Sequence, residues 1–326
     1  MEARLNRSGK LLLPRIRVTN LRDQTDLRKA YDKTIQKQLR RLGRPSKRGE
    51  AVEAKKREQK FKAILKKDPE FYVLYRSINL SATWLSIVAA TLMMDLGHPD
   101  NKGEPADEQV AALAFFSRLA NDLWAIIELV ERGFDLQARA LARSYLEHVD
   151  VLICCINDIE LTKEFVAAIE PDASNHFWHK HVSKNKIKKR VASFIAGAIG
   201  LPDTDVVDSL REPAELAGSA LHHPTVLAGL IAAFGDEDVD YGETYPIFPI
   251  PVAASGGIFR VLLTHQFWLF FAMGLLPKSP NGAWGGLLRK DEYLNNRFLD
   301  ELKRINNQML GFLLENELLM KVKAPE

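Results

Sequence analysis

Apolar side chains recur at intervals of three and four residues along most of this 326-residue chain, and this spacing restricts its fold more than any other feature. Before residue 69 the spacing predicts two helices, at about 23–42 and 50–67. After it, the spacing predicts helices at about 71–95, 105–133, 136–157, 160–170, 176–199, 204–222, 255–276 and 291–320. No run alternates with a period of two for long enough to predict a sheet. We therefore predict an all-α, multi-helix bundle.

Charge divides the chain into two regions. Residues 1–67 contain 22 Lys and Arg but only 7 Asp and Glu, whereas the remaining residues contain 23 and 35. The pair Asp68-Pro69 ends the first region, because a residue before proline is biased away from the helical conformation. We predict a basic helical N-terminal arm over residues 1–68 and an all-helical bundle domain over residues 69–326.

Cysteine content and apolar runs bear on the cellular compartment. The two cysteines, Cys154 and Cys155, are adjacent, so we predict reduced core thiols in a cytoplasmic protein. The uncharged stretch Ser77–Met94 is just long enough to span a membrane, but it contains several Ser, Thr and Asn residues. The stretch Ile258–Leu276 includes Arg260, which would be costly in lipid. We interpret both as core helices and expect no membrane partner.

The predicted helix 136–157 contains the most informative polar residues. Arg139, Arg143 and Glu147 are four residues apart and therefore share one helix face. Asp135 is predicted to cap this helix at its start. The surrounding residues are mostly apolar, which predicts a central position in the bundle. An arginine buried there would require a partner, so one interpretation is that Glu147 holds Arg143 in a structural pair.

A second interpretation starts from the pair Arg143 and His148. Their Arg-x4-His spacing resembles the motif of HEPN domains, helical bundles of which many are RNA-cleaving toxins or antiviral defence effectors. The resemblance covers about residues 105–225. It implies a homodimer whose cleft cleaves RNA without a metal ion. His148 would move the proton of a ribose 2′-hydroxyl, Arg143 would bind the scissile phosphate, and Glu147 would orient one of them.

A broader resemblance links the same helix to a later segment. The run Arg139 to Glu147, followed by Ser219-x2-His222, is similar to a bacterial all-helical family of uncharacterised function. It implies that Ser219 and His222 face Arg143 and Glu147, with Arg139 in support. A hydroxyl and an imidazole could satisfy the spare donors and acceptors of an Arg–Glu pair. A structural polar network and an active site both remain open.

Two basic segments suggest binding to nucleic acid, with RNA favoured over DNA. The first helix of the arm places four cations on one stripe, namely Lys29, Lys33, Lys37 and Arg41. The second segment follows Phe177 and Trp178, which could stack on bases, and its cations include Lys184, Lys188 and Lys189. A solvated helix face, an acidic partner surface and an anionic membrane are the alternatives.

The histidines at positions 176, 179 and 181 raise the question of a metal ion. No Cys or carboxylate stands at zinc-like spacing around them, so we predict neither a metal nor a cofactor. The first functional hypothesis is an RNA-directed nuclease that acts through Arg143 and His148. The second is a non-catalytic nucleic-acid-binding or assembly subunit. A small-molecule pocket around Arg143 is a third.

Overall fold

The computed structural model describes residues 4–5, 11–12, 47–96, 105–200, 203–205, 207–208, 251–273 and 297–319. The chain divides into two compact units, Met1–Lys56 and Arg57–Glu326. In the first unit, strands β1 (Arg4–Leu5) and β2 (Leu11–Leu12) form one short antiparallel pair. The predicted helix 23–42 and most of the predicted helix 204–222 lie outside the described residues.

The predicted all-α fold is confirmed for the part of the chain that the structure describes. Its α-helices are α3 (Lys47–Lys67), α4 (Pro69–Leu96), α5 (Asp107–Glu131), α6 (Asp135–Asn157), α7 (Ile159–Ala167), α8 (Pro171–Phe177), α9 (Lys186–Ile199), α12 (Gly256–Ala272) and α13 (Arg297–Glu315). A π-helical turn, η2 (Trp178–Val182), follows α8, and a 3₁₀ turn, η3 (Ala253–Ser255), precedes α12.

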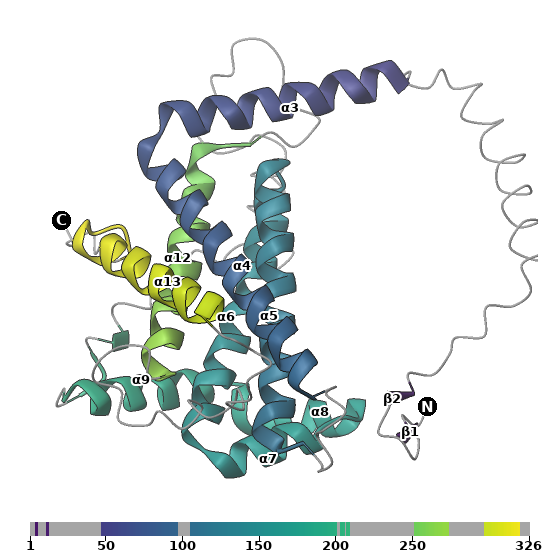
Figure 1. Cartoon of the computed structure of the whole chain (residues 1–326), viewed down its shortest axis with the longest axis vertical. Helices are drawn as coiled ribbons and strands as arrows, with labels where there is room; N and C mark the ends of the chain where they lie inside the picture. Colours follow the sequence, from purple (N-terminus) through teal and green to yellow (C-terminus); the bar gives the residue numbers. More distant parts are fainter. Residues whose placement is uncertain are drawn as a thin grey trace, which may run out of the picture. The chain divides into compact units, whose positions relative to one another are not determined.

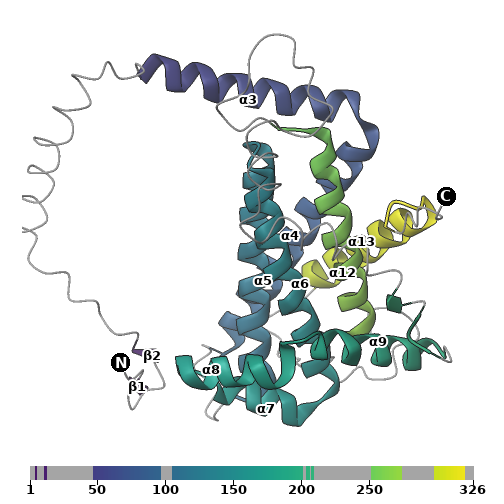
Figure 2. The same ribbon diagram turned by 180° about the vertical axis from the view of Figure 1, so that it is seen from behind.

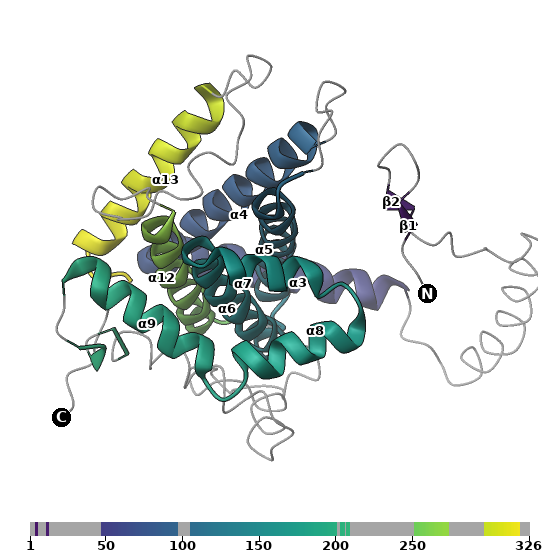
Figure 3. The same cartoon turned by 90° about the horizontal axis from the view of Figure 1, so that it is seen from below.

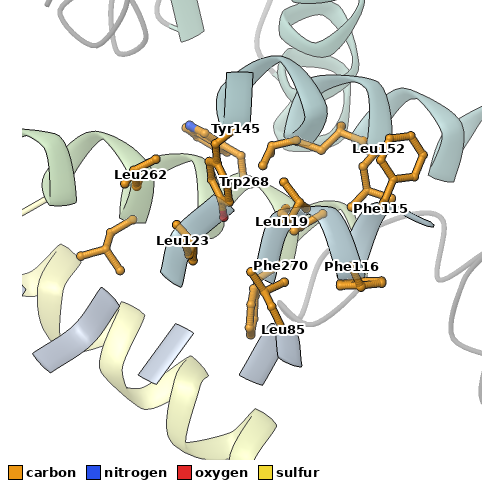
Figure 4. Close-up of a cluster of buried hydrophobic side chains, with 14 of the residues drawn as sticks. Leu85, Phe115, Phe116, Leu119, Leu123, Tyr145, Leu152, Leu262, Trp268 and Phe270 are labelled. Carbon is orange, nitrogen blue, oxygen red and sulfur yellow. The ribbon is translucent and has the colours of Figure 1, made fainter. Parts of the chain in front are cut away.

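The long helices α4, α5, α6 and α12 run alongside one another (Figures 1 and 2), with α13 packed on α4 and α12. Helices α7, α8 and α9 lie across one end of this bundle (Figure 3). The core between the long helices is built from large apolar side chains such as Leu119 of α5, Tyr145 of α6 and Phe270 of α12 (Figure 4). As predicted, α6 is central, because it packs against α5, α7, α9 and α12.

Two aspartates explain where helices begin. Asp68 separates α3 from α4, and its carboxylate accepts a hydrogen bond from the backbone N–H of Phe71 at 2.9 Å. Asp158 caps α7 in the same way, through the backbone N–H groups of Glu160 and Leu161. The prediction that Asp135 caps α6 is wrong. Asp135 is the first residue inside the helix, and its carboxylate is occupied by other side chains.

The single helix predicted over 176–199 is also wrong, because the chain breaks between η2 and α9. Lys184 and Asn185 have φ angles of 57° and 60°, in the left-handed region that ends a right-handed helix. The Lys186 ammonium group donates to the carbonyls of His179 and Lys180, both at 3.0 Å, which satisfies the end of the preceding turn. Neither proline nor glycine marks this break in the sequence.

Cys154 and Cys155 are both buried and neither forms a disulfide, in agreement with the prediction of core thiols. Burial raises the pKa of the Cys155 thiol to about 12. Two described helical stretches, Pro69–Met94 and Asp107–Glu131, are long and apolar enough to cross a membrane. About half of each is buried inside the protein, and core helices of soluble proteins have the same length and composition. The absence of a membrane partner therefore stays a prediction.

Candidate functional site

His148 lies on α6, partly exposed, with one ring nitrogen fixed by its own helix. Its Nδ1 is 2.6 Å from the backbone carbonyl oxygen of Ser144, one turn earlier. Because a carbonyl oxygen can only accept, Nδ1 carries the proton, and Nε2 of the neutral ring keeps its lone pair. Among the described residues Nε2 makes no hydrogen bond. The helix therefore orients the imidazole and leaves its basic nitrogen available.

Arg143 is not buried, contrary to the premise of a structural pair in the core. The side chains of Arg143 and Glu147 are 39% and 32% exposed, and Arg143 Nε is 3.4 Å from Glu147 Oε1. The pairing predicted from their spacing is therefore present, but it is long and solvated. Such a surface pair contributes little to stability, about 0–1 kcal/mol. The guanidinium can leave Glu147 for an incoming anion at low cost.

A second arginine, Arg118 of α5, approaches the same part of α6. Its Nε donates to the Asp122 carboxylate at 2.9 Å, and one Nη donates to the Ser144 hydroxyl at a longer 3.5 Å. That hydroxyl lies 3.5 Å from His148 Nδ1. The Asp122 side chain is only 7% exposed, whereas half of Arg118 is solvent-accessible. Arg118 was not predicted from the sequence, although an Arg-x3-Asp pair within an apolar helix is a usable signal.

Arg139 serves the scaffold and does not join Arg143. Its Nε donates to Asp135 at 2.6 Å, and both side chains are less than one fifth exposed. The other oxygen of Asp135 accepts a hydrogen bond from the Ser255 hydroxyl at 2.7 Å. Asp135 thus ties the start of α6 to the turn that precedes α12. The support of Arg143 by Arg139 therefore stays a prediction.

Several predicted residues lie outside the described residues. They are Ser219 and His222 of the proposed network, and the basic stripe Lys29, Lys33, Lys37 and Arg41. The juxtaposition of Ser219 and His222 with Arg143 and Glu147 therefore stays a prediction.

The segment from 177 to 190 is only partly available for a ligand. Lys184 and Lys189 are exposed, and Lys188 is partly buried. Trp178 is 43% exposed, but Phe177 is buried, with its ring 5.7 Å from that of Phe165. Of the two aromatic residues predicted to stack on bases, only Trp178 can reach one.

Other cations of this segment are held by acidic residues. The Glu164 carboxylate accepts hydrogen bonds from Lys180 at 2.6 Å and from His181 at 2.9 Å. Arg190 donates to Asp158 at 2.8 Å. Within the described residues, no three His, Cys, Asp or Glu side chains are grouped to hold a metal ion. The segment therefore offers Lys184, Lys189 and Trp178 as its exposed binding groups.

The comparisons with known proteins add no relative. No model of a known protein family matches the chain, and neither a curated protein nor a solved structure matches it. The function must therefore be argued from the residues themselves.

Proposed function

We propose that this protein binds RNA and cleaves it, with Arg143 and His148, two partly exposed residues of α6, as the reacting pair. The observation that carries the proposal is the orientation of His148. A backbone carbonyl holds Nδ1–H, so the lone pair of Nε2 remains as a general base, and Arg118 reaches the Ser144 hydroxyl beside the same ring. This arrangement supports acid–base chemistry on a phosphodiester.

The chemistry requires one proton acceptor and a positive group near the phosphate. His148 Nε2 takes the proton of a ribose 2′-hydroxyl, and the oxygen attacks the adjacent phosphorus. The bond from phosphorus to the 5′-oxygen breaks, which leaves a 2′,3′-cyclic phosphate. The 5′-oxygen receives a proton from an imidazolium or from water. Arg143 leaves Glu147 and binds the phosphate oxygens, where negative charge builds up.

Two further elements of the proposal come from the HEPN resemblance. One is a homodimer, in which the His148 imidazolium of a second copy can protonate the leaving 5′-oxygen. The other is a role as a cytoplasmic toxin or antiviral defence effector. Arg118 strengthens the site, because its position beside Ser144 places a second cation near His148.

Cleavage of total RNA in the presence of a chelator tests the proposal. Arg143→Ala and His148→Ala should each lower the rate by about 10²–10⁴-fold, the usual contribution of acid–base catalysis. Matched controls are Arg132→Ala and His176→Ala, which remove exposed side chains elsewhere. Circular dichroism should show the same helicity in all four variants. Absence of cleavage by the unmodified chain, or cleavage that survives both substitutions, would overturn the proposal.

A second candidate is a non-catalytic nucleic-acid-binding or assembly subunit. The observation that favours it is the chain of contacts from Arg139 through Asp135 to Ser255, which uses polar residues of α6 for structure. If this candidate is correct, the unmodified chain will bind RNA without cutting it, and Ser255→Ala will weaken folding without changing RNA affinity.

A further inference from the structure

One side of α3 is rich in lysines. Phe61 and Ile64 are buried, whereas Lys55, Lys60, Lys62, Lys66 and Lys67 are exposed. We refer to these five side chains as the lysine face. At about 100° of rotation per residue they occupy a sector of roughly 160° on the side away from Phe61 and Ile64. The face extends over about 18 Å, from a rise of about 1.5 Å per residue.

The apolar side of α3 is already used by the protein itself. The Phe61 ring meets those of Phe71 and Tyr75 edge-on, with centroids 5.9 and 5.2 Å apart. No large apolar side chain of residues 54–67 points outward with the lysines. An amphipathic helix binds a membrane by burying its apolar face in the lipid. Because that face of α3 is docked on α4, the helix has no free apolar face to bury in lipid.

The lysine face is also nearly free of opposing charge. Within 54–67 the acidic residue is Glu58, and it pairs with Lys62 at 2.5 Å. The side chains of Lys55, Lys60, Lys66 and Lys67 make no ion pair with the described residues. The same sector of residues 54–67 exposes a single amide, that of Gln59, and no aromatic ring. The five ammonium groups are point charges, which fit a regular row of phosphates and carry no sequence preference.

We infer that the lysine face of α3 is a docking surface for the phosphate backbone of a nucleic-acid duplex. The inference rests on the proposed function for the class of partner but not for the cleavage chemistry. The length of the face corresponds to about five base pairs at about 3.4 Å each. The surface would hold the nucleic acid without regard to sequence.

Fluorescence anisotropy with a labelled DNA duplex of about 20 base pairs tests the inference over a range of salt concentrations. DNA lacks the 2′-hydroxyl, so the proposed cleavage cannot consume the probe. The full chain is compared with the triple variant Lys60→Gln, Lys66→Gln and Lys67→Gln. Each lost phosphate contact lowers the slope of log K against log salt by about 0.9, so the slope should fall by roughly 2–3. The affinity should fall at least about tenfold.

Two control variants separate the lysine face from net charge. Replacing the same three lysines by arginine keeps the charge and should keep the affinity. Replacing Arg132, Lys163 and Arg304 by glutamine removes three exposed cations elsewhere and should leave the salt slope unchanged. Circular dichroism should show the same total helicity in each variant.

Three results would contradict the docking of a duplex on the lysine face. The inference is overturned if the triple glutamine variant binds like the unmodified chain, or if the distant triple variant weakens as much. It is also overturned if the chain binds vesicles of phosphatidylcholine and phosphatidylserine but no duplex. If the variants Arg143→Ala and His148→Ala show that the nuclease proposal is wrong, the duplex-binding measurement is still valid, because the DNA probe is never cut.

Discussion

Tyr145 makes a polar contact inside the apolar core. Its side chain is fully buried, and its hydroxyl donates to the Gln266 side-chain oxygen at 2.7 Å, which links α6 to α12. The amide nitrogen of Gln266 is buried and has no hydrogen-bond partner among the described residues. Burial, with a smaller contribution from the Asp122 carboxylate, raises the pKa of Tyr145 well above its usual value, so the hydroxyl remains a donor.

The hydrogen bond between Tyr145 and Gln266 predicts that a single variant should be less stable than a double variant. Tyr145→Phe should lower the free energy of unfolding by about 1–3 kcal/mol, because both polar atoms of Gln266 are then unsatisfied. The double variant Tyr145→Phe with Gln266→Leu should recover most of that loss, since it removes the buried amide as well. Urea denaturation of the two single variants and the double variant measures the coupling. Equal stability of Tyr145→Phe and the double variant would contradict this account.

The candidate site was predictable from sequence only along one helix. The Arg143–Glu147 and Ser144–His148 relations follow from the four-residue spacing of a helix face. The approach of Arg118 to Ser144 joins residues 26 positions apart on two helices. Periodicity gives the buried side of each helix but not the register between neighbours. The exposure of Arg143 depends on that register in the same way.

At the scale of elements, Glu164 fastens α7 to the π-helical turn that follows α8. Its hydrogen bonds from Lys180 and His181 lower its pKa to about 2. A carboxylate with a lowered folded-state pKa stabilises the fold above its unfolded value, near 4.3. That contribution is lost as the pH falls from there toward 2.

Glu164→Gln should therefore change the acid sensitivity of the fold. The unmodified chain should be the more stable above about pH 5, and the difference should shrink as the pH falls to 2. Thermal unfolding midpoints across this range measure the effect. Glu170→Gln, an exposed carboxylate without a side-chain hydrogen bond to a described residue, is the control. A difference that stays constant from pH 5 to pH 2 would exclude the Glu164 pairing as its cause.

Replacing a glycine by alanine should have opposite effects at two positions near the end of α9, Gly197 within the helix and Gly200 directly after it. A Cβ atom at Gly197 or at Gly200 would meet nothing within 4 Å, so only the backbone differs. Gly197 is helical, and Gly197→Ala should stabilise the protein by about 0.5–1 kcal/mol. Gly200 ends the helix with φ of 75°, and Gly200→Ala should destabilise it by about 1 kcal/mol. Denaturation curves that shift in the same direction for both variants would contradict the assignment of this helix end.

The helices themselves were more predictable than their interruptions. The starts of α4 and α7 follow from Asp68-Pro69 and from Asp158, since each has a local signal. The break at Lys184 and Asn185 has no glycine or proline, and its turn is held partly by the Lys186 ammonium group. A contact made by a long flexible side chain leaves no periodic pattern in the sequence.

At the scale of the molecule, the charge boundary and the structural boundary differ. The basic region ends near residue 67, but the second compact unit begins at Arg57. The residues between them belong to α3 and contribute Phe61 and Ile64 to the core. The charge boundary follows the lysines of α3. The structural boundary follows the apolar contacts of the same helix, because these contacts join it to the core.

This boundary can be tested with two shortened chains. A chain of residues 57–326 should keep the free energy of unfolding within about 1 kcal/mol of the full chain, because the buried apolar residues that the structure describes all lie after Arg57. A chain of residues 69–326 should lose about 3 kcal/mol or more, because Phe71 and Tyr75 lose their contacts with Phe61. Phe61→Ala with Ile64→Ala in the full chain should reproduce most of the second loss. If both shortened chains unfold alike in urea, the end of α3 is part of the basic arm and not of the bundle.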